Sequence, residues 1–224
     1  MLVDKPKGWT SHDVVAKVRG ILQKNPPAGG GKKVKVGHTG TLDPLATGLL
    51  VLLVGSYTKR ASEFSKLDKT YEVLMKLGET STTGDEEGIK TVVSSSQIVD
   101  REEVEETLKQ FVGENMQVPP AFSAVKVDGK RAYKLAREGK EFVLEPRKVT
   151  IHDVKNIEYA YPKVKFTVEV SSGTYIRSLV QDIGKKLDTG AYMSNLRRTK
   201  VGEYELDEAI SPNDVTEAGT FSSQ

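Results

Sequence analysis

Apolar and polar residues follow one another along this chain in patterns that predict both helices and strands. Apolar positions three and four residues apart predict a helix that begins at Thr10 or Ser11 as its N-cap. The apolar positions of this helix are Val14, Val15, Val18, Ile21 and Leu22. The apolar run 49–54 predicts a buried strand, and alternation over 69–77 and 164–170 predicts two half-buried strands.

Local signals predict where further elements begin and end. Asp100 followed by Glu103 forms a capping-box pattern that predicts a helix start, and Gly139 predicts the end of a short helix. Ser211 followed by Pro212 predicts a last helix start. We also expect a short helix at 57–66, a polar loop at 78–85, a flexible loop rich in glycine and proline at 25–33, and a helix that opens after 171–175 and runs through Leu187.

The composition narrows the class of protein. The chain has 224 residues, enough for one large domain or two small ones, and 37% hydrophobic with 29% charged residues suits a soluble globular enzyme. It has no cysteine, which excludes disulfides, zinc–thiolate sites and thiol catalysis. Its histidines, His12, His38 and His152, show no metal-ligand spacing. The longest apolar run is far too short for a membrane span and no signal peptide is recognisable, so we expect a cytoplasmic protein.

Charge is distributed unevenly, although the formal net charge is only +2. Acidic residues gather at 85–87 and 100–106. The basic clusters are Lys32, Lys33 and Lys35; Lys59, Arg60, Lys66 and Lys69; Arg131, Lys134, Arg137, Lys140, Arg147 and Lys148; and Arg197, Arg198 and Lys200. Such clusters are compatible with a local face that binds a polyanion, and equally with a mixed, solvated surface.

The segment 37–48, which leads into the apolar run, carries the strongest candidate for chemistry. Gly37 and Gly40 permit close backbone approach, and Pro44 favours an extended Asp43. Asp43 is therefore expected on a stiff loop at the edge of a core sheet, where it can act as a nucleophile, a base or a metal ligand. The same residues also fit an Asx-type turn, in which the carboxylate only caps local N–H groups.

The string Gly-His-Thr-Gly-Thr-Leu-Asp-Pro-Leu-Ala-Thr-Gly at 37–48 closely resembles the catalytic motif of the TruB-type tRNA pseudouridine synthases. A phosphate loop is excluded, because Gly-x-x-x-x-Gly-Lys-Ser/Thr is absent. Other segments resemble further motifs of the family in the expected order: Lys5-Pro6-Lys7-Gly8-Trp9-Thr10-Ser11, Lys69-Thr70-Tyr71, 78–85, 117–126, 129–139, Gly173-Thr174-Tyr175-Ile176-Arg177 and 196–202. The resemblance extends from Met1 to about Val215.

The resemblance implies a set of site residues. Asp43 stands where the family has its catalytic aspartate, Tyr71 lies against the target base and assists proton movement, and Arg177 pairs with the aspartate. In that pair, a guanidinium fork would orient the carboxylate and keep it ionised. The implied substrate-binding residues, besides Tyr71, are His38, Tyr175 and Leu196; the implied supporting residues are Lys5, Pro6, Thr41 and Pro44; and the implied contacts to the RNA backbone are Arg131, Lys134, Arg137 and Arg197.

The resemblance also implies an α+β fold of the pseudouridine synthase type, with a mixed, largely antiparallel central sheet flanked by helices and an RNA-binding cleft. One catalytic domain would span 1–215, followed by a disordered tail at 216–224 and no PUA domain. The implied reaction isomerises uridine to pseudouridine at position 55 in the T-loop of tRNA, after the base is flipped out of its stack. Asp43 would act as nucleophile or as base at C2′. The implied enzyme is a monomer whose partner is the tRNA T-arm, and it needs no cofactor and no metal.

Two other functions are compatible with parts of the sequence. A non-catalytic tRNA-folding module could use the same cleft and flip the base without isomerising it. An enzyme acting on small nucleotides could use the glycine-rich loop, and it would bind free nucleoside phosphates. The presence of Asp43, Tyr71 and Arg177 together favours the isomerase.

Overall fold

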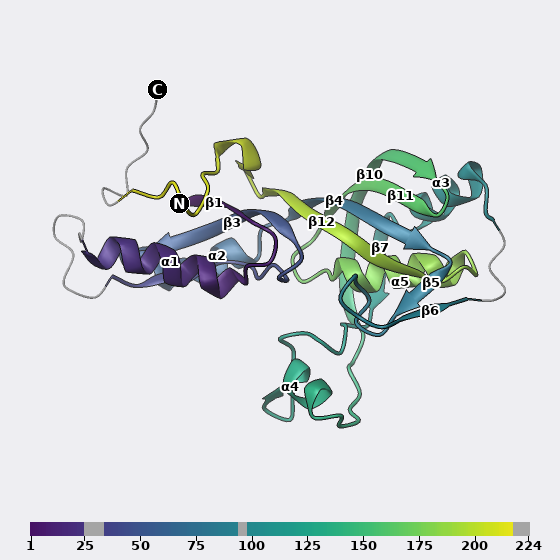
Figure 1. The fold of residues 1–224 in the computed structure, drawn as a ribbon, viewed down its shortest axis with the longest axis horizontal. Coiled ribbons are helices and arrows are strands. Elements are labelled where there is room, and N and C mark those ends of the chain that lie inside the picture. The colour runs from purple at the N-terminus through teal and green to yellow at the C-terminus, as the bar shows by residue number, and fades with distance from the viewer. Residues whose placement is uncertain (25–33, 94–97, 217–224) are drawn as a thin grey trace. The chain divides into compact units, whose positions relative to one another are not determined.

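The computed structural model describes residues 1–24, 34–93 and 98–216 (Figure 1). The predicted loop at 25–33 and nearly all of the predicted tail lie outside these residues. The chain divides into two compact units, which we call unit 1 (Met1–Tyr71 with Arg197–Gln224) and unit 2 (Glu72–Leu196). Strands β4 (Lys69–Leu77) and β12 (Ala191–Val201) contribute residues to both units.

Unit 1 is built around strand β3 (Thr47–Val54), the apolar run that the sequence predicted as a buried strand. Strands β1 (Leu2–Lys5) and β2 (Val36–His38) pair antiparallel with β3, and the end of β12 pairs parallel with its first residues. Helix α1 (Ser11–Lys24) lies along this sheet in Figure 1. Its buried face packs on Leu50 and Leu52 of β3 in one core cluster. The remaining strand of unit 1, β13 (Tyr204–Glu205), pairs antiparallel with β12.

The start of α1 confirms Thr10 as the N-cap. The Asp13 N–H donates to the Thr10 hydroxyl at 3.1 Å, and the Thr10 N–H donates to the Asp13 carboxylate at 2.8 Å. These reciprocal bonds are the capping-box arrangement, with Asp in place of Glu.

The short helix expected at 57–66 is confirmed, and it consists of two successive segments. Residues Gly55–Arg60 form a 3₁₀ helix, η1, followed by the short α-helix α2 (Ala61–Ser65). The Thr58 hydroxyl donates to the Gly55 carbonyl at 2.7 Å. This three-residue back-bond accompanies the tighter winding of a 3₁₀ turn.

Unit 2 contains a sheet with the strand order β12-β4-β11-β10-β7. Its strands include β7 (Gly113–Gln117), β10 (Arg147–Ala160) and β11 (Lys163–Val170), and its main helices are α3 (Arg101–Gln110) and α5 (Ile176–Lys186). The alternation predicted for β4 and β11 is confirmed, because every second residue is buried. The helix start at Asp100 is also confirmed, since its side chain accepts the Glu103 N–H at 2.9 Å.

Two smaller parts of unit 2 complete the fold. The polar loop expected at 78–85 is partly wrong, because Glu79–Ser81 forms β5, which pairs with β6 (Lys90–Val92). Residues 119–146, which we call the α4 lobe, stand apart from the sheet in Figure 1. The lobe contains β8 (Lys126–Val127), β9 (Lys130–Arg131) and α4 (Ala132–Arg137). As predicted, Gly139 follows the helix end, with φ +65°.

The helix start expected at Ser211 and Pro212 is wrong. In the described residues up to 216, the segment after the 3₁₀ helix η2 (Leu206–Glu208) is a turn without a helix. The Asn213 N–H donates to the Ser211 hydroxyl, and the Asp214 N–H donates to the Ser211 carbonyl. The hydroxyl therefore closes a local turn, which is the alternative use of the same capping chemistry.

Strands paired in both senses, with helices packed on them, make the expected α+β fold. Within the described part of the chain, no helix is long and apolar enough to cross a membrane.

Candidate active site

The loop that carries Asp43 joins β2 to β3 in unit 1, and its backbone is bound on several sides. The Thr39 N–H donates to the Val51 carbonyl at 3.1 Å, and the Ala46 N–H donates to the Asp43 carbonyl at 3.0 Å. The Gly8 N–H donates to the Pro44 carbonyl at 2.8 Å. We call residues 39–46, between β2 and β3, the Asp43 loop. Asp43 itself is half-buried.

Lys5 reaches the Asp43 loop from β1. Its side chain is completely buried, and its ammonium donates to the carbonyls of Pro6 at 2.9 Å, Trp9 at 2.6 Å and Pro44 at 3.3 Å. Burial lowers the pKa of Lys5 to about 8, although the negative charge of Asp43 acts in the opposite direction. The resemblance implied a supporting role for Lys5, and these bonds join it directly to the residue after Asp43.

Ser11 is a second support, which the sequence did not reveal. Its hydroxyl donates to the Leu42 carbonyl at 3.1 Å and accepts the Leu42 N–H at 2.8 Å. The sequence favoured Ser11 only as an alternative N-cap, and that role belongs to Thr10. No local sequence pattern predicts a bond between residues 31 positions apart.

Three further site candidates of unit 1, His38, Thr41 and Tyr71, lie on β2, on the Asp43 loop and on β4. His38 lies on β2, and its Nδ1 is buried without a hydrogen-bond partner among the described residues. Burial and the charge of Arg198 lower the pKa of His38, so its imidazole is neutral at pH 7. Tyr71 is buried on β4, and Thr41 is exposed.

Arg197 uses its guanidinium inside unit 1. It donates to the Asp4 carboxylate at 2.7 Å and to the Thr47 hydroxyl at 3.2 Å. The ion pair joins β12 to β1 and the second bond joins it to β3, so the side chain that was expected on the RNA backbone also has partners within the fold.

In unit 2, Arg177 lies in the first turn of α5, as predicted, and its side chain is buried. Its guanidinium donates to the Thr83 carbonyl at 3.1 Å and to the Phe122 carbonyl at 2.9 Å, and it lies 3.6 Å from the Asp85 carboxylate. Asp85 is fixed in turn by the Thr83 hydroxyl and the Glu87 N–H. The sequence assigned no role to Asp85, although it lies in a segment that resembles a family motif.

Tyr175 precedes α5 as its N-cap residue and is held by Gln117 of β7. The Tyr175 N–H donates to the Gln117 side-chain oxygen at 2.8 Å, and the Gln117 side-chain amide donates to the Tyr175 carbonyl at 3.1 Å. This two-bond clamp positions the strand-to-helix turn that leads to Arg177. Gln117 is another support without a local sequence signal. Leu196, on β12, is buried.

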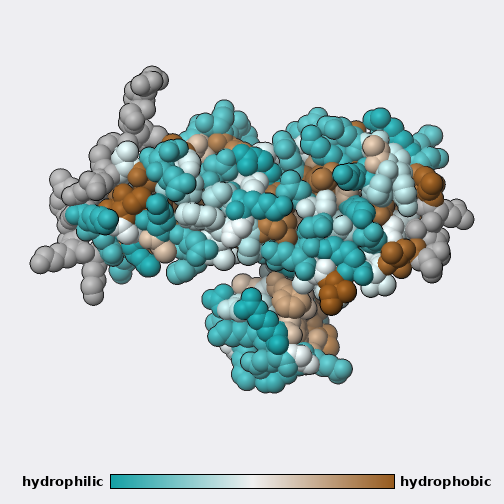
Figure 2. Space-filling model, in the orientation of Figure 1, coloured by the Kyte–Doolittle hydropathy of each residue, from teal (hydrophilic) through white to brown (hydrophobic). Residues whose placement is uncertain are grey.

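The remaining candidates lie on the α4 lobe. Arg131, Lys134 and Arg137 are all exposed, and the guanidinium of Arg137 lies 5.6 Å from the centre of the Tyr133 ring. Figure 2 shows hydrophilic side chains over much of the lobe's visible face. Exposed cations beside an aromatic ring are suited to contact with a nucleic acid.

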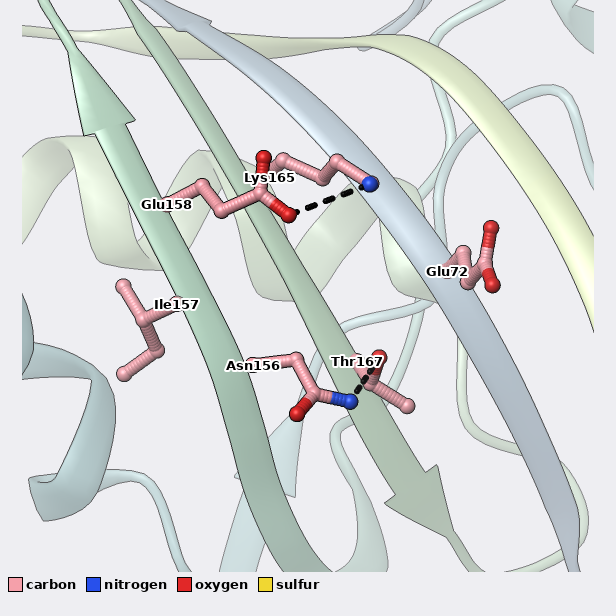
Figure 3. A pocket seen from close by; sticks show the side chains of 6 residues that line it. All are labelled: Glu72, Asn156, Ile157, Glu158, Lys165 and Thr167. Carbon is pink, nitrogen blue, oxygen red and sulfur yellow. Dashed lines mark hydrogen bonds and ion pairs between the residues drawn. The ribbon is translucent and has the colours of Figure 1, made fainter.

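A groove of about 340 Å³ lies elsewhere in unit 2, on strands β4, β10 and β11 (Figure 3). It is lined by Glu72, Asn156, Ile157, Glu158, Lys165 and Thr167, and so contains none of the predicted site residues. Its only lysine is paired with Glu158 at 3.2 Å. Two carboxylates in its wall disfavour a phosphate, so the groove is not a candidate for binding the RNA backbone.

The described residues also contain no group of three or more His, Asp or Glu side chains arranged to hold a metal ion.

Comparison with known proteins identifies the family. Residues 30–176 match the TruB family pseudouridylate synthase N-terminal domain, and residues 177–224 match the tRNA pseudouridylate synthase B C-terminal domain. The chain belongs to the TruB family. A tRNA pseudouridine synthase B from Parabacteroides distasonis is 46% identical, over 95% of this chain and 89% of the relative. One from Bacteroides fragilis is 45% identical, over 93% and 88%.

A solved structure, described as a Cbf5-Nop10-Gar1 complex, contains a chain of the same fold. The TM-score is 0.68 and the sequence identity is 32%. The match covers 93% of this chain but only 51% of the solved one, so the present chain spans about half the length of that neighbour. The expected pseudouridine synthase fold is therefore confirmed.

Proposed function

We propose that this protein isomerises uridine to pseudouridine in tRNA, at position 55 of the T-loop. Membership of the TruB family, together with relatives named tRNA pseudouridine synthase B, supports an isomerase that acts on tRNA. The observation that carries the proposal is the half-buried Asp43, on a family-motif loop whose backbone is bound by α1, β1 and the turn at Gly8.

In this reaction the C1′–N1 bond breaks, the uracil rotates, and C5 bonds to C1′. C5 then loses its proton and N1 gains one, so no electrons are gained or lost and no cofactor is required. Asp43 acts as the nucleophile at C1′ or as the base that removes the C2′ proton. Both roles need an ionised carboxylate, and the buried cation of Lys5 favours that form.

Arg177 is proposed as the residue that orients the Asp43 carboxylate. A guanidinium offers a planar pair of donors, which matches the two oxygens of a carboxylate. The bonds from Arg177 to the Thr83 and Phe122 carbonyls, with Asp85 beside it, restrict the rotation of this fork. Restricted rotation supports a positioning function, because a freely rotating side chain would lose more entropy on pairing.

The other predicted residues are assigned to the uridine and to the RNA. Tyr71 and Leu196 hold the uracil, Tyr175 also contacts the substrate, and the neutral His38 takes the space that the flipped base vacates. The exposed cations of the α4 lobe contact the phosphates of the T-arm. Residues 1–215 act as one catalytic domain, and the enzyme works as a monomer in the cytoplasm.

Pseudouridine mapping by mass on an unmodified tRNA transcript tests this function. The wild-type protein should convert position 55 alone, and an isolated T-arm stem-loop should be converted at a similar kcat/KM. Asp43→Asn should bind the tRNA normally and release no tritium from uracil C5, because the amide keeps the shape but not the charge. Binding and refolding of tRNA by the wild-type protein without conversion would instead identify a tRNA-folding module.

A further inference from the structure

The largest fully buried side chain in the described residues is a cation, Arg198 of β12, which is 2% exposed. Within those residues, its hydrogen bonds go to main-chain carbonyls. Nε donates to the Leu49 carbonyl at 2.7 Å, and Nη2 donates to the Gly40 carbonyl at 3.0 Å. Gly40 lies in the Asp43 loop, and Leu49 lies on β3, on the other side of Asp43 in sequence. One guanidinium therefore joins the start of the loop to the strand that follows it.

Burial of this charge is costly, so its presence needs a reason beyond stability. A buried charge loses its hydration, and an apolar side chain of similar volume often stabilises a fold more. Burial lowers the pKa values of Lys5 and Lys69 to about 8 and also lowers that of His38, and the charge of Arg198 adds a smaller decrease to all three. A leucine or methionine at this position would avoid both costs, but it could not bind two carbonyls.

The backbone around Arg198 is as tightly fixed as its side chain. Arg198 pairs with Gly48 in the parallel contact between β12 and β3. Gly48 has φ +103°, and a Cβ there would overlap the Arg198 carbonyl oxygen. Only glycine allows this approach. The backbone of Arg198 is thus fixed against β3, and its guanidinium binds the loop from this fixed position.

We propose that Arg198 is a positioning residue for the reaction, and that it acts by fixing the start of the Asp43 loop to β3. This inference rests on the proposed function. The Nε and Nη2 donors of one rigid plane reach two carbonyls at once, which the single ammonium of lysine cannot reproduce with the same geometry. Loss of the fork would release the start of the loop from β3 and displace the Asp43 carboxylate. Arg198 does not contact the RNA in this proposal.

The test compares Arg198→Lys and Arg198→Gln with the wild type, by single-turnover tritium release and by tRNA binding. Both variants should lose roughly 100-fold in kcat, because a displacement of about 1 Å at the reacting group has that effect. KM and the tRNA Kd should change by less than about threefold. Val18→Ala is the control for stability, because Val18 is fully buried in the core of unit 1, in a cluster that contains no residue of the Asp43 loop.

Three outcomes would overturn the inference: an Arg198→Lys enzyme with kcat within threefold of the wild type, an equal loss of kcat in Val18→Ala at a matched loss of Tm, or a loss confined to KM. Failure of the proposed function would look different, because the wild type itself would then form no pseudouridine.

A second measurement needs no variant. The Ala46 N–H, bonded to Asp43 inside the closed loop, should exchange with solvent as slowly as the Leu52 N–H of β3. Exchange on the order of 100-fold faster at Ala46 would mean that the loop opens while Arg198 is in place, and it would refute the proposal even if the Arg198 variants failed to fold.

Discussion

At the scale of single residues, the proposed chemistry depends on how Arg177 presents its two donors. We expect Arg177→Lys to lower kcat by about 100-fold and to leave the tRNA Kd nearly unchanged. Lysine keeps the charge but lacks the planar fork, so it cannot satisfy the Thr83 and Phe122 carbonyls and orient a carboxylate at the same time. Single-turnover tritium release and filter binding measure the two quantities separately.

Arg101→Lys is the matched control for Arg177→Lys. Arg101 is an exposed arginine that pairs with Glu105 on α3, so the same chemical change there should leave kcat unaltered. A kcat for Arg177→Lys within a few-fold of the wild type would contradict the proposed role of Arg177.

Lys5 predicts a pH dependence of stability. Its ordinary pKa is 10.5, and burial lowers the folded value to about 8. Below pH 8 both states hold the proton, so the folded state bears the full cost of the buried ammonium. Between pH 8 and 10.5 the unfolded state binds more protons than the folded one. The free energy of unfolding should therefore rise with pH, by at most about 1.4 kcal/mol per pH unit from this group.

Urea unfolding of the wild type and of Lys5→Met, from pH 7 to pH 10, isolates this contribution. The difference in unfolding free energy between the two proteins should be constant below pH 8 and should grow in favour of the wild type above it. Lys69, whose pKa is also lowered to about 8, is present in both proteins and cancels in the subtraction. A difference that stays constant across the range would show that Lys5 keeps its ordinary pKa.

At the scale of elements, the first turn of α1 has two adjacent hydroxyls with different functions. Thr10 caps the helix, and Ser11 binds both main-chain polar groups of Leu42. Thr10→Ala should lower the unfolding free energy by about 1 kcal/mol and leave kcat unchanged. Ser11→Ala should lower it by about 1–3 kcal/mol, because it leaves a buried N–H and carbonyl unpaired, and should lower kcat as well.

The pair of variants at Thr10 and Ser11 separates helix stability from loop position. Urea unfolding gives the first quantity, and single-turnover tritium release gives the second. If both variants lowered kcat in proportion to their loss of stability, α1 would matter only as part of the core, and the bond between Ser11 and the Asp43 loop would have no separate role.

At the scale of the whole molecule, the exposed cations of the α4 lobe predict a salt effect. Replacing Arg131, Lys134 and Arg137 together by glutamine should weaken tRNA binding and flatten the plot of log K against log salt. The slope should fall by roughly 0.7–0.9 for each phosphate that the protein no longer neutralises. The matched control replaces three exposed lysines of the β10–β11 hairpin, Lys155, Lys163 and Lys165, by glutamine. An equal decrease of slope in both triple variants would show that the effect comes from the net charge of the protein and not from the α4 lobe.

The limits of sequence reasoning follow from distance along the chain. Strands β4 and β11 could be predicted because alternation repeats within the strand, and the caps at Thr10 and Asp100 could be predicted because their bonds span three residues. The residues that support the Asp43 loop could not be predicted in this way. Ser11 binds Leu42, 31 positions away, and Arg198 binds Gly40, 158 positions away. The prediction of a helix start at Ser211 was wrong for another reason, because a hydroxyl that caps a helix can equally close a turn.

The tight binding of the Asp43 loop also determines which partner must deform. A loop bound by Lys5, Ser11 and Arg198 has little freedom left, so the motion needed to expose the target uridine belongs to the RNA. The rate should then depend on how firmly the target base is stacked within the T-loop itself. Base changes that weaken stacking inside the T-loop should accelerate the proposed reaction, and changes that strengthen it should slow the reaction.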